Sequence, residues 1–368
     1  MPLGAPHRRR RCSRPRRGTL SLHKIITAGR KLMPMKAVVI LGAGASAGFG
    51  VPTLRNVFKD KAARDHLAAD SFLRQKLENK IWKPRGVDLE TSDRSLTVEE
   101  ILTMIRDAEQ QDYGWPRVIT PAQAEPFRRA LYCLIKKAVY DGKNSRKGIL
   151  DPLLKYMRRK QFESVTWASF NWDCMFEAAF YYSSGDSGTY RTNPDVVVKL
   201  KDWTGYTSKK HKFLKLHGAI NWWYENDELV YLRFTPRGSL DAKWNAYQTG
   251  AAVGQPVILE PSFYKYSGEI YDLLKGQWQH FVDALAEADL VIVVGYSLPE
   301  SDSQARAVIT LGFQWNRDAQ WIVIDESADT CDRYLRIVGD RRLTPLPIKL
   351  EDLNPGLEAA LDAFIDAG

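Results

Sequence analysis

A short apolar run followed by glycines constrains the fold of this chain more than any other stretch. The run is Val38–Leu41, and glycines come directly after it at positions 42, 44, 48 and 50. An apolar run without polar alternation is typical of a parallel strand that is buried on both faces of a sheet. We therefore predict an α/β fold whose first strand ends in a glycine turn.

The glycine turn fits the dinucleotide-binding pattern G-x-G-x-x-G only in part, because Ala47 stands where the third glycine would be. Glycines allow the backbone to approach a pyrophosphate and to direct N–H groups toward it. The turn alone leaves two interpretations open, a phosphate site or a plain tight connection between a strand and a helix.

The excess of basic residues is concentrated at the N-terminus. Residues 1–34 carry ten Lys and Arg and no acidic residue, and removing these ten from the 53 basic residues leaves 43 against 44 acidic ones. We therefore do not expect direct nucleic-acid binding by the rest of the chain. We interpret residues 1–34 as a disordered basic extension or a mis-assigned start, with targeting as the alternative. No apolar stretch is long enough for a signal peptide or a membrane span, so we expect a cytoplasmic protein.

We expect residues 35–368 to form one α/β domain with a mainly helical insertion at about 56–160. In this region Thr97 and Glu100 form a Thr-x-x-Glu capping box at the start of an amphipathic helix. Helices are also expected at Glu125–Tyr140 and Leu150–Arg159.

After residue 164 the pattern alternates between strands and helices, with helices at Gly268–Glu287 and Asp302–Leu311. This alternation predicts a Rossmann-like, doubly wound parallel sheet. The predicted strands that follow the first one are Val165–Ser169, Phe213–Leu216, Val257–Glu260, Leu290–Val294 and Trp321–Ile324.

Five landmarks, in order along the chain, resemble the signature motifs of the sirtuin family. Residues 42–46 and 50–55 (G-A-G-A-S and G-V-P-T-L-R) resemble G-A-G-x-S followed by G-I-P-x-F-R. Residues 169–173 (S-F-N-W-D) stand where sirtuins carry T-Q-N-x-D. Further along, L-H-G at 216–218, G-Y-S at 295–297 and I-D-E at 324–326 resemble the catalytic histidine motif, the G-T-S turn and the strand end that holds the adenosine ribose. The resemblance covers roughly residue 36 to the C-terminus and implies a sirtuin-type fold.

The chain departs from the protein-deacylating sirtuins in its cysteines. Cys12, Cys133, Cys174 and Cys331 include no C-x-x-C pair. We therefore expect neither a disulfide framework nor the zinc module that the resemblance associates with deacylases, and no metal.

The resemblance implies NAD as the substrate and three catalytic residues. Asn171 would position a water or a ribose hydroxyl at the anomeric carbon, Asp173 would order the pocket, and His217 would be the general base. The residues expected to bind NAD are Gly42, Ala43, Gly44, Ser46, Pro52, Thr53, Arg55, Gly295, Ser297 and Asp325.

Several of these residues also have structural interpretations. Asn171 and Asp173 could cap the following helix, and His217 could be a satisfied core histidine. We expect Asp302 to cap a helix. Two tryptophans, Trp222 and Trp223, are expected to pack in the core rather than to stack on a ligand.

The absent zinc module and the helical insertion favour water as the nucleophile, and hence an NAD+ hydrolase that produces nicotinamide and ADP-ribose. The alternatives are an NAD-dependent protein deacylase or ADP-ribosyltransferase, and a non-catalytic NAD or ADP-ribose-binding regulatory module. Residues 215–222 and 294–299 resemble the sirtuin-like effectors of prokaryotic anti-phage defence, which cause abortive infection by depleting NAD.

Such effectors are held inactive until triggered. We expect only a short helix, Leu357–Ala367, after the sheet, and therefore no sensor domain in this chain. The resemblance then implies control by homo-oligomer formation or by a separate sensor partner, such as a translocase-type ATPase or a prokaryotic Argonaute.

Overall fold

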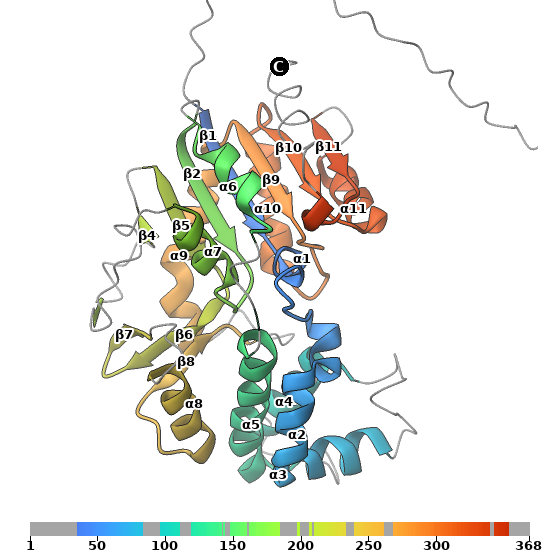
Figure 1. Cartoon of the computed structure of the whole chain (residues 1–368), viewed down its shortest axis with the longest axis vertical. Helices are drawn as coiled ribbons and strands as arrows, with labels where there is room; N and C mark the ends of the chain where they lie inside the picture. Colours follow the sequence, from blue (N-terminus) through green and yellow to red (C-terminus); the bar gives the residue numbers. More distant parts are fainter. Residues whose placement is uncertain are drawn as a thin grey trace, which may run out of the picture. The chain divides into compact units, whose positions relative to one another are not determined.

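The strand that ends in the glycine turn lies inside a seven-stranded sheet (Figure 1). In the computed structural model, β1 (Met35–Leu41) pairs in parallel with β2 (Phe162–Ser169) on one side and with β9 (Leu290–Val294) on the other. Residues 38–41 are at most 1% exposed, as expected for a strand covered on both faces. The structure describes residues 35–83, 96–110, 119–141, 143, 148–159, 162–184, 197–198, 206–207, 210–232, 239–260, 268–338 and 342–352.

The strand order of this sheet is β11-β10-β9-β1-β2-β5-β4. On one side of β1 the chain continues through β2 to β5 (His211–Lys215), and on the other through β9 to β10 (Gln320–Ile324) and β11 (Leu343–Leu346), all in parallel. The edge strand β4 (Tyr206–Thr207) is antiparallel to β5. The order reverses between β1 and β9, which is the topological switch point of a doubly wound sheet. The predicted fold class is confirmed.

Helices from the second half of the chain cover this sheet. Helix α9 (Glu269–Glu287) contacts β1, β2 and β5, and α10 (Ser303–Trp315) packs against α9. Helix α11 (Ala328–Val338) contacts β10 and β11. Two shorter helices, α6 (Asp151–Met157) and α7 (Met175–Ser184), lie before and after β2 in sequence and contact each other.

The chain between β1 and β2 is helical over most of its described length. Helix α5 (Pro121–Tyr140) contacts α2 (Lys61–Ala69), α4 (Val98–Gln110) and α8 (Ser239–Thr249), as Figure 1 shows. The predicted capping box at the start of α4 is present, because the Glu100 amide donates to Thr97 Oγ1 (3.2 Å) and the Thr97 amide to Glu100 Oε2 (2.7 Å). The remaining helical elements are α1 (Ala43–Ala47), η1 (Leu54–Lys59), α3 (Ser71–Arg74), η2 (Gln75–Trp82) and η5 (Leu350–Asp352).

A second sheet corrects one of the predictions. The segment predicted as a parallel strand at Val257–Glu260 is β8 (Gln255–Ile258), which pairs antiparallel with β6 (Gly218–Glu225). Together with β7 (Glu228–Tyr231) and β3 (Val197–Val198) these strands form a four-stranded sheet of order β3-β7-β6-β8.

Trp222 and Trp223, on β6, are 1% and 0% exposed, so they pack in the core as predicted. The predicted helix Leu357–Ala367 and the basic segment 1–34 lie outside the described residues, and the insertion boundaries stay a prediction.

Candidate functional site

Three strand ends meet at the carboxyl edge of the parallel sheet, at the switch point. The Gly42 amide donates to the carbonyl oxygen of Val294 (3.0 Å), at the end of β9. The Phe170 amide, just past β2, donates to the Leu41 carbonyl (2.9 Å) at the end of β1. The turns after β1, β2 and β9 are therefore fixed to one another by backbone hydrogen bonds.

The glycines of these turns pack too closely for any side chain. A Cβ on Gly42 would lie 2.4 Å from the Tyr296 Cα, and one on Gly44 would lie 2.7 Å from the Gly295 Cα. Gly295 also has a φ of 58°, a left-handed conformation that glycine adopts without strain. The Gly44 amide donates to the Gly295 carbonyl (2.8 Å), so this N–H holds the second turn rather than pointing outward.

Asn171 joins the turn after β2 to the glycine turn. Its Nδ2 donates to the Gly42 carbonyl (2.7 Å) and to Ser46 Oγ (2.9 Å). A carbonyl oxygen only accepts, so this contact fixes which end of the amide is nitrogen. The Nδ2 group of the half-buried Asn171 thus donates both of its hydrogen bonds to the protein. Its Oδ1 accepts no hydrogen bond from the residues that the structure describes.

Asp173 is buried and has a structural role in this geometry. Its Oδ1 accepts a hydrogen bond from the amide of Met175, the first residue of α7 (2.9 Å). Its backbone carbonyl accepts from the ammonium of Lys215 (2.6 Å), which is paired with Glu177 (2.9 Å). Lys215 is the last residue of β5, two positions before His217. Its ammonium therefore joins this strand to α7 through Glu177 and to the turn that carries Asn171 through the Asp173 carbonyl.

His217 lies in the turn between β5 and β6 and is 7% exposed. Its Nδ1 lies 3.1 Å from the carbonyl oxygen of Phe170, whose ring meets the imidazole edge-on at a centroid distance of 5.1 Å. Its Nε2 lies 3.4 Å from Oδ1 of Asp302. Gly218 has a φ of 73°, and a Cβ there would lie 1.9 Å from the Val257 carbonyl oxygen, so the turn needs glycine at this position.

Asp302 is the N-cap residue of α10, as expected, and its carbonyl accepts from the Arg306 amide (2.9 Å), but its side chain makes no capping hydrogen bond. Its Oδ2 accepts from the Tyr296 hydroxyl (2.5 Å), and its Oδ1 faces His217. Sequence reasoning missed this role because Asp before a helix is such a common cap that no residue pattern pointed elsewhere.

The other predicted NAD-binding residues lie around these turns. Ser297 is exposed in the turn after β9, and Asp325 follows β10, where its Oδ1 accepts from the Ser327 amide (2.9 Å). Burial raises the pKa of the Asp325 carboxyl, while hydrogen bonds from Ser327 and Thr330 lower it in part. Backbone bonding brings the β9 and β10 ends together, since the Gly295 amide donates to the Ile324 carbonyl (2.9 Å).

Pro52, Thr53 and Arg55 stand at the start of η1, with Arg55 exposed. Within the described ranges, no hydrogen bond or ion pair joins them to Asn171 or His217. Hydrogen bonds therefore connect five of the predicted site residues to one another: Gly42, Gly44, Ser46, Asn171 and Gly295. The three residues near η1 are not part of this hydrogen-bonded group.

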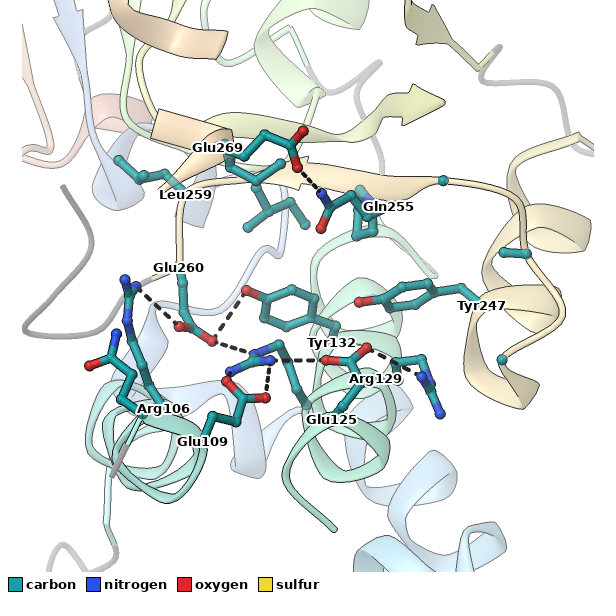
Figure 2. A pocket seen from close by; sticks show the side chains of 18 residues that line it. Arg106, Glu109, Glu125, Arg129, Tyr132, Tyr247, Gln255, Leu259, Glu260 and Glu269 are labelled. Atoms are coloured by element: carbon teal, nitrogen blue, oxygen red, sulfur yellow. Dashed lines mark hydrogen bonds and ion pairs between the residues drawn. The ribbon is translucent and has the colours of Figure 1, made fainter. Parts of the chain in front are cut away.

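A pocket of about 460 Å³ lies elsewhere, between α4, α5 and the end of β8, and none of the predicted site residues lines it (Figure 2). Its buried Glu260 accepts from Arg128 Nε (3.0 Å) and lies 3.5 Å from the Tyr132 hydroxyl. Burial raises the pKa of the Glu260 carboxyl, and the Arg128 guanidinium lowers it in part. A hydrogen bond from the Leu259 amide to the His217 carbonyl (2.9 Å) connects the wall of the pocket to the histidine turn. Sequence reasoning missed this network, since its residues come from separate segments.

Among the described residues, no group of three His, Cys, Asp or Glu side chains could hold a metal ion. None of the helices in the described part of the chain is both long enough and apolar enough to cross a membrane.

The fold and these turns define an α/β protein with a glycine-rich switch-point site. No protein-family model and no curated protein matches the chain. Among solved structures it is similar to Sir2Tm bound to a propionylated peptide, with 12% identity and a TM-score of 0.43 over 88% of this chain and 93% of that one. It is also similar to a Sir2 complex with a p53 peptide and NAD+ (11%, TM-score 0.43, 89% and 94%) and to a structure from work on the mechanism and regulation of Sir2 enzymes (14%, 0.43, 89% and 92%). The strand order defines the fold class of the chain.

Proposed function

We propose that this protein is an NAD+ hydrolase, which cleaves NAD+ with water to give nicotinamide, ADP-ribose and a proton. The bond that breaks joins the nicotinamide nitrogen to the ribose anomeric carbon, and the bond that forms joins that carbon to the water oxygen. The observation that carries the proposal is the geometry of Asn171 at the switch point, where doubly wound sheets bind nucleotides.

The polarity of the Asn171 amide supports a role beside the anomeric carbon. Its Nδ2 donates to the protein, so Oδ1 is the atom available to a ligand. An oxygen in this state accepts a hydrogen bond from a water molecule and orients the water's lone pair toward an electron-poor carbon. Such positioning lowers the barrier to attack.

The residues proposed to hold the rest of NAD+ follow from their positions. Ala43 and Gly44 are exposed at the switch point and would lie beside the pyrophosphate, together with Ser297. Asp325, at the end of β10, would accept hydrogen bonds from ribose hydroxyls, as carboxylates at this position do in other nucleotide sites.

The sequence resemblance also supports a biological setting. We infer that depletion of NAD+ by this chain serves anti-phage defence, under control by self-assembly or by a separate sensor protein. Expression of the active chain would then lower cellular NAD+ only once a trigger is present, and an Asn171→Ala chain would not lower it.

The first experiment incubates the purified chain with NAD+, with and without an acetylated peptide, and measures nicotinamide, ADP-ribose and acetyl-ADP-ribose by chromatography. ADP-ribose that forms without peptide and is lost in Asn171→Ala supports the hydrolase. The control is Asn245→Ala, which removes an exposed asparagine on α8 and should leave the rate unchanged. Acetyl-ADP-ribose would identify a deacylase instead. NAD+ binding without any product would indicate a chain that needs its trigger or a non-catalytic NAD-binding module.

A further inference from the structure

We propose that the pocket between α4, α5, α8 and β8 is a binding site for a small organic cation, which is a molecule with an ammonium or guanidinium group. The pocket has a volume of about 460 Å³, within the range of small-molecule sites. None of the residues predicted to bind NAD or to act in catalysis lines it. The site is therefore separate from the proposed NAD+ site and does not depend on it.

Residues from several elements enclose the pocket. In Figure 2, Gln255 of β8 and Glu269 of α9 lie above it, Glu125 of α5 lies below, and the rings of Tyr132 and Tyr247 lie between them. Glu269 is exposed, and so is Glu125, whose side chain is 48% exposed. A molecule from solvent can therefore reach a carboxylate on each side of the pocket.

The Tyr247 hydroxyl is an unused hydrogen-bonding group of this pocket. Tyr247 is 7% exposed, and its ring packs edge-on against Trp223 (5.6 Å) and Trp244 (5.7 Å). Its hydroxyl points inward, toward Tyr132, and makes no hydrogen bond with any residue that the structure describes (Figure 2). Buried polar groups in proteins nearly always have a partner. The hydroxyl thus offers a bound molecule one donor and its lone pairs.

The guanidinium groups of α5 are already paired with carboxylates. Arg128 Nε donates to Glu260 (3.0 Å), and its terminal nitrogens donate to Glu109 and Glu125. The neighbouring Arg129 donates to Glu125 (3.3 Å). An anion that entered the pocket would have to displace one of these carboxylates from Arg128, which argues against phosphate or a carboxylic acid as the bound molecule.

Negative charge exceeds positive charge in the pocket, because four glutamates and three arginines line it. These residues are Arg106, Arg128, Arg129, Glu109, Glu125, Glu260 and Glu269. The Glu269 carboxylate accepts from the uncharged Gln255 side chain (2.9 Å) and forms no ion pair with a cation of the described residues. A bound cation would form a charge-assisted hydrogen bond with Glu269, and the tyrosine rings would add cation–π attraction.

The test titrates the full chain with agmatine, a four-carbon chain that carries an ammonium and a guanidinium group, and measures affinity by calorimetry. We expect a dissociation constant of about 1 mM or lower, and about tenfold weaker binding of uncharged 1,4-butanediol and of inorganic phosphate. No binding of agmatine in this range, or tighter binding of phosphate, would overturn the proposal.

Two variants test whether agmatine lies in this pocket. Tyr247→Phe removes the unused hydroxyl, and Glu269→Gln removes the unpaired charge but keeps an oxygen for Gln255. Each should raise the dissociation constant about fivefold or more and leave the free energy of unfolding unchanged. The matched controls are Tyr224→Phe and Glu163→Gln, which alter residues outside the pocket and should bind agmatine like the wild type. Unchanged affinity in both pocket variants would place agmatine elsewhere and overturn the proposal.

NMR locates the probe without a change to the pocket and without any assay of NAD+ hydrolysis. In a chain labelled with 15N-leucine, the amide signal of Leu259, which lines the pocket, should shift when agmatine is added. The signal of Leu311, exposed on α10, should not. Leu259→Met and Leu311→Met assign the two signals. Asn171→Ala should keep the full affinity for agmatine, because the two sites share no residue. An unmoved Leu259 signal, or affinity lost in Asn171→Ala, would overturn the separate site, whatever the outcome for hydrolysis.

Discussion

The amide of Gly44 donates a 2.8 Å hydrogen bond to the carbonyl oxygen of Gly295, and this bond joins the turns that follow two neighbouring strands, β1 and β9. The two turns interlock, since a Cβ on Gly295 would lie 2.4 Å from both the Ala45 nitrogen and the Gly44 carbonyl carbon. The glycines at this edge are therefore required for packing as well as for any approach to a phosphate.

Gly295→Ala should destabilise the fold by about 3 kcal/mol or more, because the new methyl group meets backbone atoms and the φ of 58° is unfavourable for alanine. Urea unfolding measures this change. The matched control is Gly276→Ala in α9, where a Cβ has nothing within 4 Å, and here we expect a gain of about 0.5 to 1 kcal/mol. Equal stability of the two variants would contradict the interlocked turns.

Asp173 offers a test that separates a cap from a catalytic group. Asp173→Ala should lose about 1 kcal/mol of stability, because the Met175 amide loses its acceptor. Asp173→Asn keeps an oxygen for this amide and should retain most of the stability and the turnover. Chemical unfolding and NAD+ hydrolysis assays on both variants check this, and a stable Asp173→Asn variant without turnover would show that the charge itself is needed.

Removing one partner of the buried Lys215–Glu177 pair should destabilise the fold more than removing both. Lys215→Met should cost about 3 to 5 kcal/mol, because Glu177 is left buried without its partner, whereas the double variant with Glu177→Leu should recover most of this loss. A double-mutant cycle from unfolding free energies measures the coupling. Lys275→Met, which removes an exposed pair with Asp272, should change stability little. Additive losses in the cycle would rule out the coupling.

The lowered pKa of buried His211 leads us to expect a loss of folding stability in acid. Burial lowers the pKa of His211 to about 4, and its Nδ1 accepts the Trp167 indole N–H (3.2 Å), which requires the unprotonated nitrogen. The folded pKa lies below the unfolded value of about 6.5, so the unfolded chain binds the proton first. The contribution of neutral His211 to the free energy of unfolding is therefore fully present above pH 6.5 and falls as the pH drops toward 4.

In that window His211→Gln should reduce the slope of the unfolding free energy by about 1.4 kcal/mol per pH unit. Part of the slope should persist, because burial also lowers the pKa values of His66 and His280. An unchanged slope in the variant would show that a group other than His211 takes up the proton on unfolding.

The central strands of the parallel sheet could be predicted because β9 and most of β1 and β10 are continuous apolar runs. Leu290–Val294 was predicted with the observed bounds, and Trp321–Ile324 differs from β10 by one residue. The antiparallel sheet was missed, although Asn226 and Asp227 carry a local hairpin signal and both adopt positive φ angles (52° and 61°).

The candidate site also has a part that could be predicted from the sequence and a part that could not. The sequence placed Asn171 and the glycines at strand ends, and hydrogen bonds bring them together. The contact between His217 and Asp302 could not be predicted, because it depends on where the start of α10 meets the turn between β5 and β6. Asp302 has no local feature that distinguishes it from an ordinary residue before a helix.

The locked amide of Asn171 limits what the site can select. Both N–H bonds point into the protein, so the side chain presents incoming molecules with an acceptor and never with a donor. A nucleophile that contacts it must bring its own hydrogen, as water, an alcohol or an amine does, and a fully substituted nucleophile such as a tertiary amine finds no bond there. If NAD+ is cleaved at this edge of the sheet as proposed, the direction in which one carboxamide is held would decide which nucleophiles can bind there.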